Sequence, residues 1–156
     1  MLFRSPNTAP LYDHCVRAIE HALRFGPHGL PLFGGGDWND GMNLVGREGR
    51  GESVWLAFFL YDVLRRFADL AEQRGDAVVA DRCSIEAGRL RGNIDAVAWD
   101  GCWYRRGSFD DGLPLGAASA AECRIDSVAQ SWAVLSGAAP QARAAMALAS
   151  VDAMLV

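Results

Sequence analysis

The sequence lacks any apolar run long enough to cross a membrane. Its most apolar stretch, Val54 to Tyr61, holds eight residues, whereas a spanning helix needs about 20. The chain also lacks a basic excess, because 15 Lys and Arg residues face 19 Asp and Glu residues, for a net charge of −4. This balance argues against nucleic acid as a partner. The segment Met1 to Pro6 has no apolar core of a secretion signal. We therefore expect a cytoplasmic protein without direct membrane insertion.

Cysteine and histidine are few and poorly spaced for metal binding. The four cysteines form no Cys-x-x-Cys pair, which favours reduced thiols over a disulfide framework or a zinc site. His14, His21 and His28 recur every seven residues, too far apart along a helix to share an ion, so we expect surface histidines. A calcium loop starting at Asp37 lacks the glycine required at its sixth position. No metal and no organic cofactor is predicted.

The segment from Gly34 to Asn43 is the most informative part of the chain. Three glycines precede two carboxylates and two amides that surround one tryptophan. This composition suits neither a helix nor a central strand. Sugars are bound by such a mixture, with a flat apolar ring face against tryptophan and hydroxyls against carboxylates and amides. A solvated turn has a similar composition, since Asp, Asn and Gly are common in turns. From this segment alone, both interpretations stay open.

A second glycine-rich and charged loop, Gly46 to Ser53, leads directly into Val54 to Tyr61, which is apolar on nearly every side. A helix without a polar face is normally buried. A polar loop mounted on a buried helix is the arrangement expected where a site must be held precisely.

Helical periodicity accounts for most of the remaining chain, and Asp-Gly turn signals divide it. Thr8 is expected to cap the first helix, and Asp126 a short fourth helix. Between the third and fourth helices, Cys102 to Phe109 is expected to form a short strand or extended arm, and Leu113 to Cys123 a loop of small residues. The expected helices begin near Leu11, Ser53, Ala77, Asp126 and Pro140, and the second, third and fourth end near Ala71, Ala98 and Leu135. These features predict an all-α fold with long loops and one short extended arm.

Several motifs occur in one order along the chain. Gly-Asp-Trp-Asn-Asp-Gly-Met-Asn occupies 36–43, and Gly-Glu-Ser-Val-Trp-Leu occupies 51–56. With the segments 99–106, 109–112 and 122–132, they resemble the inverting glycoside phosphorylases related to cellobiose phosphorylase, glycoside hydrolase family 94. More closely still, they resemble the C-terminal phosphorylase-like region of bacterial cyclic β-1,2-glucan synthases. The resemblance covers about Leu11 to Gly137.

The resemblance implies an (α/α)6 barrel of two concentric helix rings with the active site at one mouth. Such a barrel needs about a dozen helices, and the sequence predicts about five. We therefore expect residues 1–156 to form part of the barrel, without a second domain. The family's C-terminal segments, which supply much of the phosphate site, have no counterpart after Val156. Uncovered apolar helix faces predict self-association, or docking of the missing part of the barrel.

Asp40 is the predicted catalytic residue. Breaking a glycosidic bond requires a carboxylic acid that protonates the leaving oxygen. An inverting hydrolase needs a second carboxylate to activate water. A phosphorylase needs one good acid only, because inorganic phosphate is itself the nucleophile and attacks from the opposite face. In the resembling family the general acid corresponds to Asp40. The expected substrates are a β-glucan oligosaccharide and inorganic phosphate.

Further residues are predicted to bind the sugar, each with an alternative interpretation. Asp37, Trp38 and Asn39 belong to the motif of Asp40, although Asp37 also suits a turn cap. Glu122 matches a family glutamate that faces the sugar, or is a surface residue. We slightly prefer an interior polar role for Gln130. Tyr104 and Arg105 lie in the extended arm, where arginine either binds phosphate or is simply solvated. Trp55 and Trp132 are expected in the core.

The family resemblance leaves two functions open. The first is phosphate-dependent inverting cleavage, or the reverse synthesis, of β-glucosidic bonds in β-1,2-glucan-type substrates. The second is a catalytically incomplete remnant of a cyclic glucan synthase that binds sugar or has a structural role only. The resemblance further implies that parent synthases are associated with the inner membrane. In place of a family asparagine and other polar residues before Glu122, this chain has the small residues Gly116 to Ala121, so a sugar contact from that asparagine is expected to be absent, and the resemblance does not predict the acceptor-side specificity.

Overall fold

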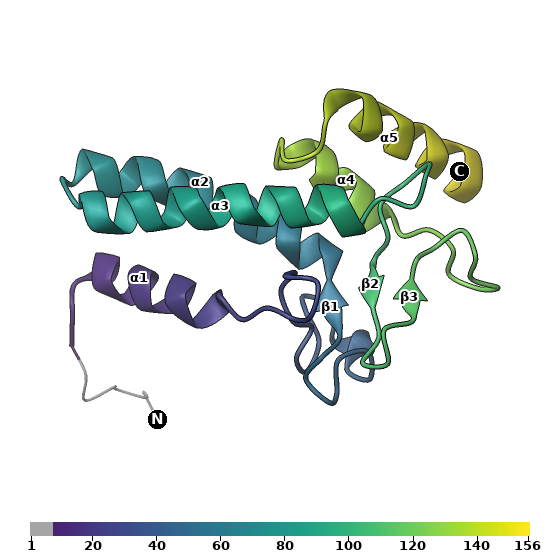
Figure 1. Cartoon of the computed structure of the whole chain (residues 1–156), viewed down its shortest axis with the longest axis horizontal. Helices are drawn as coiled ribbons and strands as arrows, with labels where there is room; N and C mark the ends of the chain where they lie inside the picture. The colour runs from purple at the N-terminus through teal and green to yellow at the C-terminus, as the bar shows by residue number, and fades with distance from the viewer. Residues whose placement is uncertain (1–7) are drawn as a thin grey trace.

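The computed structural model describes residues 8–156, and this part of the chain is helical (Figure 1). The prediction of an all-α fold is confirmed, and the arrangement is consistent with part of an (α/α)6 barrel. The helices lie close to the expected limits. They are α1 (Leu11–Ala22), α2 (Val54–Gln73), α3 (Ala77–Val97), α4 (Ser127–Leu135) and α5 (Gln141–Leu155).

Helices α2 and α3 form a long antiparallel pair that carries the core (Figure 1). The α2 helix begins where the Ser53 hydroxyl accepts the backbone N–H of Leu56 at 3.1 Å, and α3 begins where Asp76 accepts that of Val79 at 3.2 Å. Such caps satisfy amides that have no partner within the helix. As expected from its apolar start, α2 buries most of its first two turns. Among the described residues, no helix has the length and apolarity to cross a membrane.

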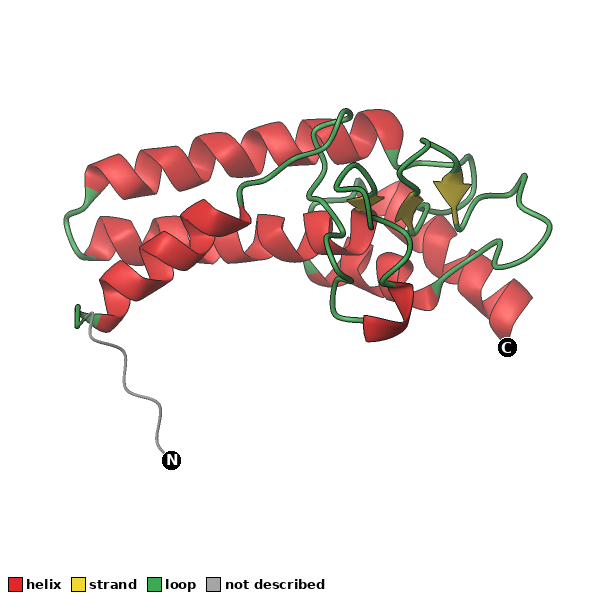
Figure 2. Cartoon of the chain, turned by 90° about the horizontal axis from the view of Figure 1, so that it is seen from below, coloured by secondary structure: helices red, strands yellow, loops and turns green. Residues whose placement is uncertain are grey.

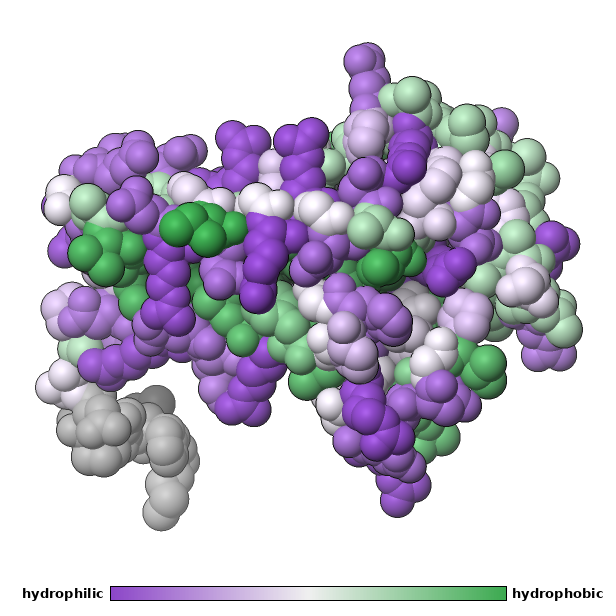
Figure 3. Space-filling view, viewed as in Figure 1, coloured by the Kyte–Doolittle hydropathy of each residue, from purple (hydrophilic) through white to green (hydrophobic). Residues whose placement is uncertain are grey.

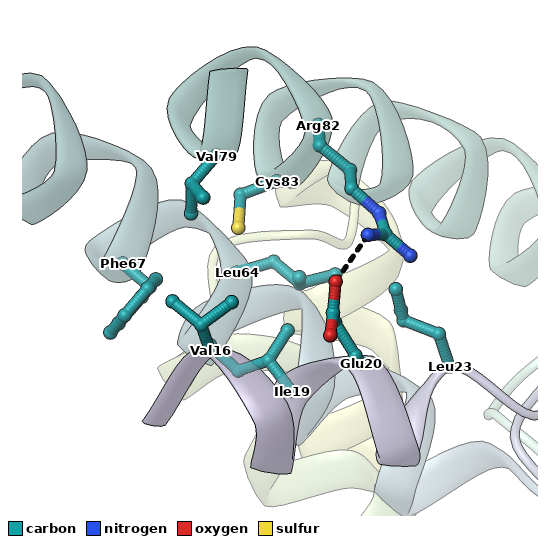
Figure 4. A pocket seen from close by; sticks show the side chains of 9 residues that line it. All are labelled: Val16, Ile19, Glu20, Leu23, Leu64, Phe67, Val79, Arg82 and Cys83. Carbon is teal, nitrogen blue, oxygen red and sulfur yellow. Dashed lines mark hydrogen bonds and ion pairs between the residues drawn. The ribbon is translucent and has the colours of Figure 1, made fainter. Parts of the chain in front are cut away.

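Helix α1 lies alongside this pair (Figure 1), and Figure 4 shows the side chains between the three helices. They enclose a hollow of about 20 Å³, which holds about one water. At the edge of this hollow, Glu20 of α1 forms an ion pair with Arg82 of α3 at 2.6 Å. Burial raises the pKa of the Cys83 thiol in the same layer, so this cysteine is an inert packing residue.

The start of α1 corrects one expectation. Pro10 is the N-cap, with φ −54° and ψ 148°, and no side chain caps the helix. Thr8 therefore lies two residues ahead of the position from which a hydroxyl caps the first turn. The cap that Asp126 was expected to provide for α4 is confirmed, since its Oδ1 accepts the backbone N–H of Val128 at 2.8 Å.

A small antiparallel sheet lies beside the start of α2. Its strands are β1 (Glu52–Ser53), β2 (Gly107–Ser108) and β3 (Pro114–Leu115), in the order β1-β2-β3. The expected extended arm contains β2, whereas β1 and β3 fall where loops were expected. Two-residue strands are too short to show an alternating pattern. At Gly107 a side chain would collide with the Glu52 carbonyl and the Phe33 ring, so glycine permits the close pairing.

Figure 2 shows the sheet and the long loops gathered at one end of the α2–α3 pair. The acidic loop 34–43, the arm around β2 and the start of α4 are thus brought together, although they lie far apart in the sequence. The face seen in Figure 3 is largely hydrophilic but carries hydrophobic residues over and below α3. Val78 and Ile85 of α3 are mostly exposed. Docking or self-association through such residues stays a prediction.

Candidate functional site

The acidic loop has a defined geometry around Asp40, which begins the short 3-10 helix η1 (Asp40–Met42). Its N-cap Asn39 accepts the backbone N–H of Gly41 at 3.0 Å, and Asp37 accepts that of Asn39 at 3.1 Å. Gly36 has φ +122°, and a Cβ there would lie 3.2 Å from the Asn39 carbonyl oxygen. These contacts fix the turn, while the Asp40 side chain stands exposed at its surface.

Asp37 anchors this loop to the interior through Arg106. The Asp37 Oδ2 atom lies 2.6 Å from Arg106 Nη2 and accepts the Ser53 hydroxyl at 2.7 Å. The exposed fractions of the Asp37 and Arg106 side chains are 0% and 2%. Because both carboxylate oxygens of Asp37 have partners in the interior, its contacts resemble the turn-cap alternative, and a sugar contact by Asp37 stays a prediction. Arg106 was missed because, in the sequence, it is one of a pair of ordinary basic residues.

Arg106 also joins the starts of two helices. Its Nη1 donates to Ser53, the N-cap of α2, at 3.2 Å, and its Nε lies 3.4 Å from Asp126, the N-cap of α4. Nε and Asp126 form an ion-pair contact without hydrogen-bond alignment. Two carboxylates thus share one guanidinium, and the positive ends of α2 and α4 offset the remaining negative charge. This cluster holds both helix starts beneath the acidic loop.

An aromatic cluster lies next to the acid. The Trp38 ring is 61% exposed, and its centroid lies 6.4 Å from that of Trp55. Trp55 stacks on Phe59 at 5.6 Å and meets Trp132 edge-on at 6.3 Å. The expected core position of Trp55 is confirmed, and Trp132 is half-buried. The most exposed ring of this cluster is therefore that of Trp38, which lies within two residues of Asp40.

Asp110 fixes the second glycine-rich loop. Its carboxylate accepts the backbone N–H groups of Glu48, Arg50 and Gly51 at 2.7, 2.8 and 2.9 Å. The amide of Glu48 is the main reason that the pKa of Asp110 lies below its usual range, and partial burial opposes this effect. The sequence shows Asp110 only as a turn residue, because its partners lie about 60 positions earlier.

Tyr104 and Gln130 lie in the interior, and their contacts within residues 8–156 are internal, so sugar contacts by these two residues stay predictions. Both are 0% exposed. The Gln130 amide pairs with the backbone of Tyr104, accepting its N–H at 2.8 Å and donating to its carbonyl at 2.7 Å. It also donates to the Asp126 carbonyl at 2.9 Å. The Tyr104 ring packs edge-on against Phe58 at 5.1 Å. These internal hydrogen bonds are those expected if Gln130 is an interior polar residue.

Arg105 and Glu122 are not joined to the acidic loop by any hydrogen bond or ion pair within residues 8–156. Arg105 pairs with Asp100 at 3.0 Å. It also lines a hollow whose lining includes no residue of the acidic loop. Glu122 is exposed in the loop before α4. The next residue, Cys123, has φ +50°, which is uncommon outside glycine. Sugar contacts by Glu122 and Arg105 stay predictions.

His28 and Glu52 form a pair that the sequence did not indicate. Glu52 is 1% exposed, and its Oε2 lies 2.5 Å from Nδ1 of His28. The three histidines were expected simply at the surface, and the partner of His28 lies 24 positions away. All four cysteines are free. Within residues 8–156, no group of three His, Cys, Asp or Glu side chains is placed to hold a metal ion.

Comparison with known proteins adds independent findings. Residues 2–156 match the description "Glycosyl hydrolase 94 superfamily, catalytic domain". The chain is 48% identical over 147 residues to the cyclic beta-(1,2)-glucan synthase NdvB of Rhizobium meliloti, covering 94% of this chain and 5% of the synthase. It is 38% identical over 151 residues to the 3-O-beta-D-glucopyranosyl-beta-D-glucuronide phosphorylase of Paenibacillus borealis, covering 96% of this chain and 20% of that enzyme. A solabiose phosphorylase of the same organism is 35% identical over 145 residues, covering 91% of this chain and 19% of that enzyme. The chain thus spans a fifth or less of these relatives.

Proposed function

The chain belongs to the glycosyl hydrolase 94 superfamily, and on this basis we propose that it forms part of a domain that cleaves β-glucosidic bonds with inorganic phosphate. The substrate proposed is a β-1,2-glucan-type oligosaccharide, and the reaction also runs in the direction of synthesis. Support comes from the similarity to a β-(1,2)-glucan synthase and to phosphorylases. A cytoplasmic location of this part of the protein belongs to the same proposal.

Asp40 is the proposed general acid. It donates its proton to the glycosidic oxygen, while phosphate attacks the anomeric carbon from the opposite face. The products are a shortened acceptor sugar and a sugar 1-phosphate of inverted anomeric configuration. The observation that carries this proposal is the exposed Asp40 carboxyl on a turn that Asn39 caps and Asp37 anchors. No organic cofactor and no metal enters the proposal.

Trp38 is proposed as the platform for the sugar ring. Its exposed indole lies two positions from Asp40 and is backed by the ring of Trp55. An aromatic face excludes water from the apolar side of a sugar, which leaves the hydroxyls for polar partners such as Asn39 and, from its own loop, Glu122. Arg105 is proposed to bind phosphate in the complete domain, which requires that phosphate reach the side of the chain on which Arg105 lies.

The test is phosphate-dependent release of sugar 1-phosphate from β-1,2-linked glucooligosaccharides. The purified chain is assayed alone, and also in place of the corresponding segment of the 3-O-beta-D-glucopyranosyl-beta-D-glucuronide phosphorylase, whose remaining length completes the domain. Asp40→Asn removes the proton donor, and we expect its rate to fall roughly 10²–10⁴-fold. Asp111→Asn, an exposed aspartate on another loop, is the matched control. A folded exchange enzyme whose activity is unchanged by Asp40→Asn excludes Asp40 as the acid.

The same experiment distinguishes the second function, a sugar-binding or structural role without turnover. That role predicts that the folded exchange enzyme binds the oligosaccharide but releases no sugar 1-phosphate above the Asp40→Asn background.

A further inference from the structure

A polar hollow, the one that Arg105 lines, lies against the small sheet and apart from the acidic loop. Its volume is about 310 Å³, at the lower end of the roughly 300–1,000 Å³ that small-molecule sites occupy. None of its lining residues belongs to the loop 34–43. Side chains from the loop before β1, the end of α3 and the arm around β2 converge on it, and we infer that it binds a saccharide at a site separate from the one that contains Asp40.

The His28–Glu52 pair gives this hollow a fixed polar group. The buried Glu52 carboxylate accepts the backbone N–H groups of His28 and Leu30, each at 3.0 Å, and its Oε2 lies 2.5 Å from Nδ1 of the His28 ring. The ring orientation is therefore set, and Nε2 points away from Glu52. The His28 side chain is 50% exposed. A buried carboxylate that orients an exposed imidazole in this way preorganises a polar contact.

Arg105 and Ser108 add further polar groups. Arg105 uses Nε and Nη2 on Asp100, and within residues 8–156 no hydrogen bond uses its Nη1 or the Ser108 hydroxyl. Trp99 supplies an aromatic wall, with Tyr104 edge-on at 4.9 Å and Arg143 over its ring at 5.2 Å. The hollow thus combines unused donors, a hydroxyl and an aromatic surface.

The charge balance favours a neutral ligand over an anion. Arg105 is paired with Asp100, and His28 with Glu52. The Arg105–Asp100 pair is neutral. The His28–Glu52 pair is neutral with a charged imidazole and negative with an uncharged one. No uncompensated positive charge therefore faces the hollow. A neutral molecule rich in hydroxyl groups, with an apolar face for Trp99, fits this lining, and a saccharide has that chemistry. The choice of a β-glucan as probe rests on the proposed function.

Two variants alter the hollow without touching the acidic loop. Ala96 of α3 is exposed and lines it, so Ala96→Leu fills space without removing a buried contact. Ala145→Leu makes the same change at an exposed position of α5 and is the matched control. His28→Ala removes the oriented imidazole, while Glu52 keeps its two backbone partners.

The experiment is a titration of the chain with a short β-1,2-linked glucooligosaccharide, followed by NMR of the indole N–H groups of Trp99 and Trp38. We expect the Trp99 signal to shift in the wild-type chain, in Ala145→Leu and in Trp38→Ala. In Ala96→Leu and His28→Ala, the Kd read from Trp99 is expected to rise at least about tenfold.

The two indoles separate this inference from the proposed function. A shift of Trp38 alone, with Trp99 unmoved at sugar concentrations that saturate Trp38, overturns the second site and leaves the proposed function intact. A shift of Trp99 alone supports the second site and weakens the proposed one. Inorganic phosphate is titrated in a parallel sample. A Trp99 shift with phosphate and none with sugar overturns the assignment to a saccharide.

Discussion

Arg106 and Asp37, 69 positions apart in the sequence, form a buried ion pair with 2.6 Å between Arg106 Nη2 and Asp37 Oδ2. The pair connects the arm around β2 to the turn that carries Asp40. Since both side chains are withdrawn from solvent, neither charge has water as a replacement partner. The position of the proposed acid thus depends on an arginine that, within residues 8–156, makes no hydrogen bond or ion pair with Asp40 itself.

Arg106→Met is expected to destabilise the chain by about 3–5 kcal/mol, because it leaves the Asp37 carboxylate buried without its partner. Urea unfolding followed by circular dichroism measures this change. Arg105→Met is the matched control at the adjacent position. Its ion pair with Asp100 is partly exposed, so we expect a loss of about 1 kcal/mol or less. Equal losses for the two variants contradict the role assigned to Arg106.

Gly36→Ala is expected to disturb the turn that presents Asp40. Gly36 has φ +122°, and a Cβ there would lie 3.2 Å from the Asn39 carbonyl oxygen. Such a backbone conformation costs about 1–3 kcal/mol for a residue other than glycine. We therefore expect lower stability and shifted amide signals across η1. At Gly35 a Cβ meets open space, so Gly35→Ala is expected to change neither. If both variants behave alike, the close approach at Gly36 is unimportant.

Asp110→Asn is expected to lower stability at neutral pH and to have little effect in acid. The Glu48 amide and the other donors hold the pKa of Asp110 below its usual value, about 3.9 in an unfolded chain. A carboxyl whose pKa is lower in the folded state stabilises that state above the unfolded pKa. This contribution is lost as the pH falls through the folded pKa.

Thermal unfolding of wild type and Asp110→Asn from neutral pH to below about pH 4 tests this. The difference in Tm is expected to shrink on acidification. Asp111→Asn is the neighbouring control, with a single backbone contact, to Leu113, and no comparable dependence is expected. A Tm difference for Asp110→Asn that stays constant with pH would mean that the carboxylate charge does not hold the loop 46–51.

Local signals account for what the sequence predicted well. Asp126 was recognised as a cap because the residues after it repeat at helical spacing, and the apolar run after Ser53 predicted the burial of α2. The composition of the segment from Gly34 to Asn43 predicted a loop that presents Asp37 to Asp40 together, since neighbours in a short loop are held together by the chain itself.

Long-range pairs account for what was missed. Nothing near Arg106 or Asp37 indicates that they pair, and the buried role of Glu52 depends on His28 in another loop. Asp110 reads as a turn residue because its three donors come from a distant segment. The strands β1 and β3 exist only through their pairing with β2. Such contacts depend on how helices and loops pack together, and this packing cannot be predicted from a local pattern of residues.

Trp38→Ala is expected to weaken sugar binding without destabilising the fold. The ring is 61% exposed, so its removal costs little buried surface, whereas a sugar stacked on it would lose its apolar contact. We expect a loss of about 2 kcal/mol, or roughly thirtyfold in Kd, measured by calorimetric titration with a β-1,2-linked glucooligosaccharide. Leu44→Ala removes another exposed apolar side chain nearby and is expected to leave the affinity unchanged. If Trp38→Ala binds as tightly as wild type at the Trp38 site while Tm is unchanged, the ring is not the platform for the sugar. If Tm falls instead and the affinity is kept, the contact between Trp38 and Trp55 serves packing, and the sugar must rest on another surface beside Asp40.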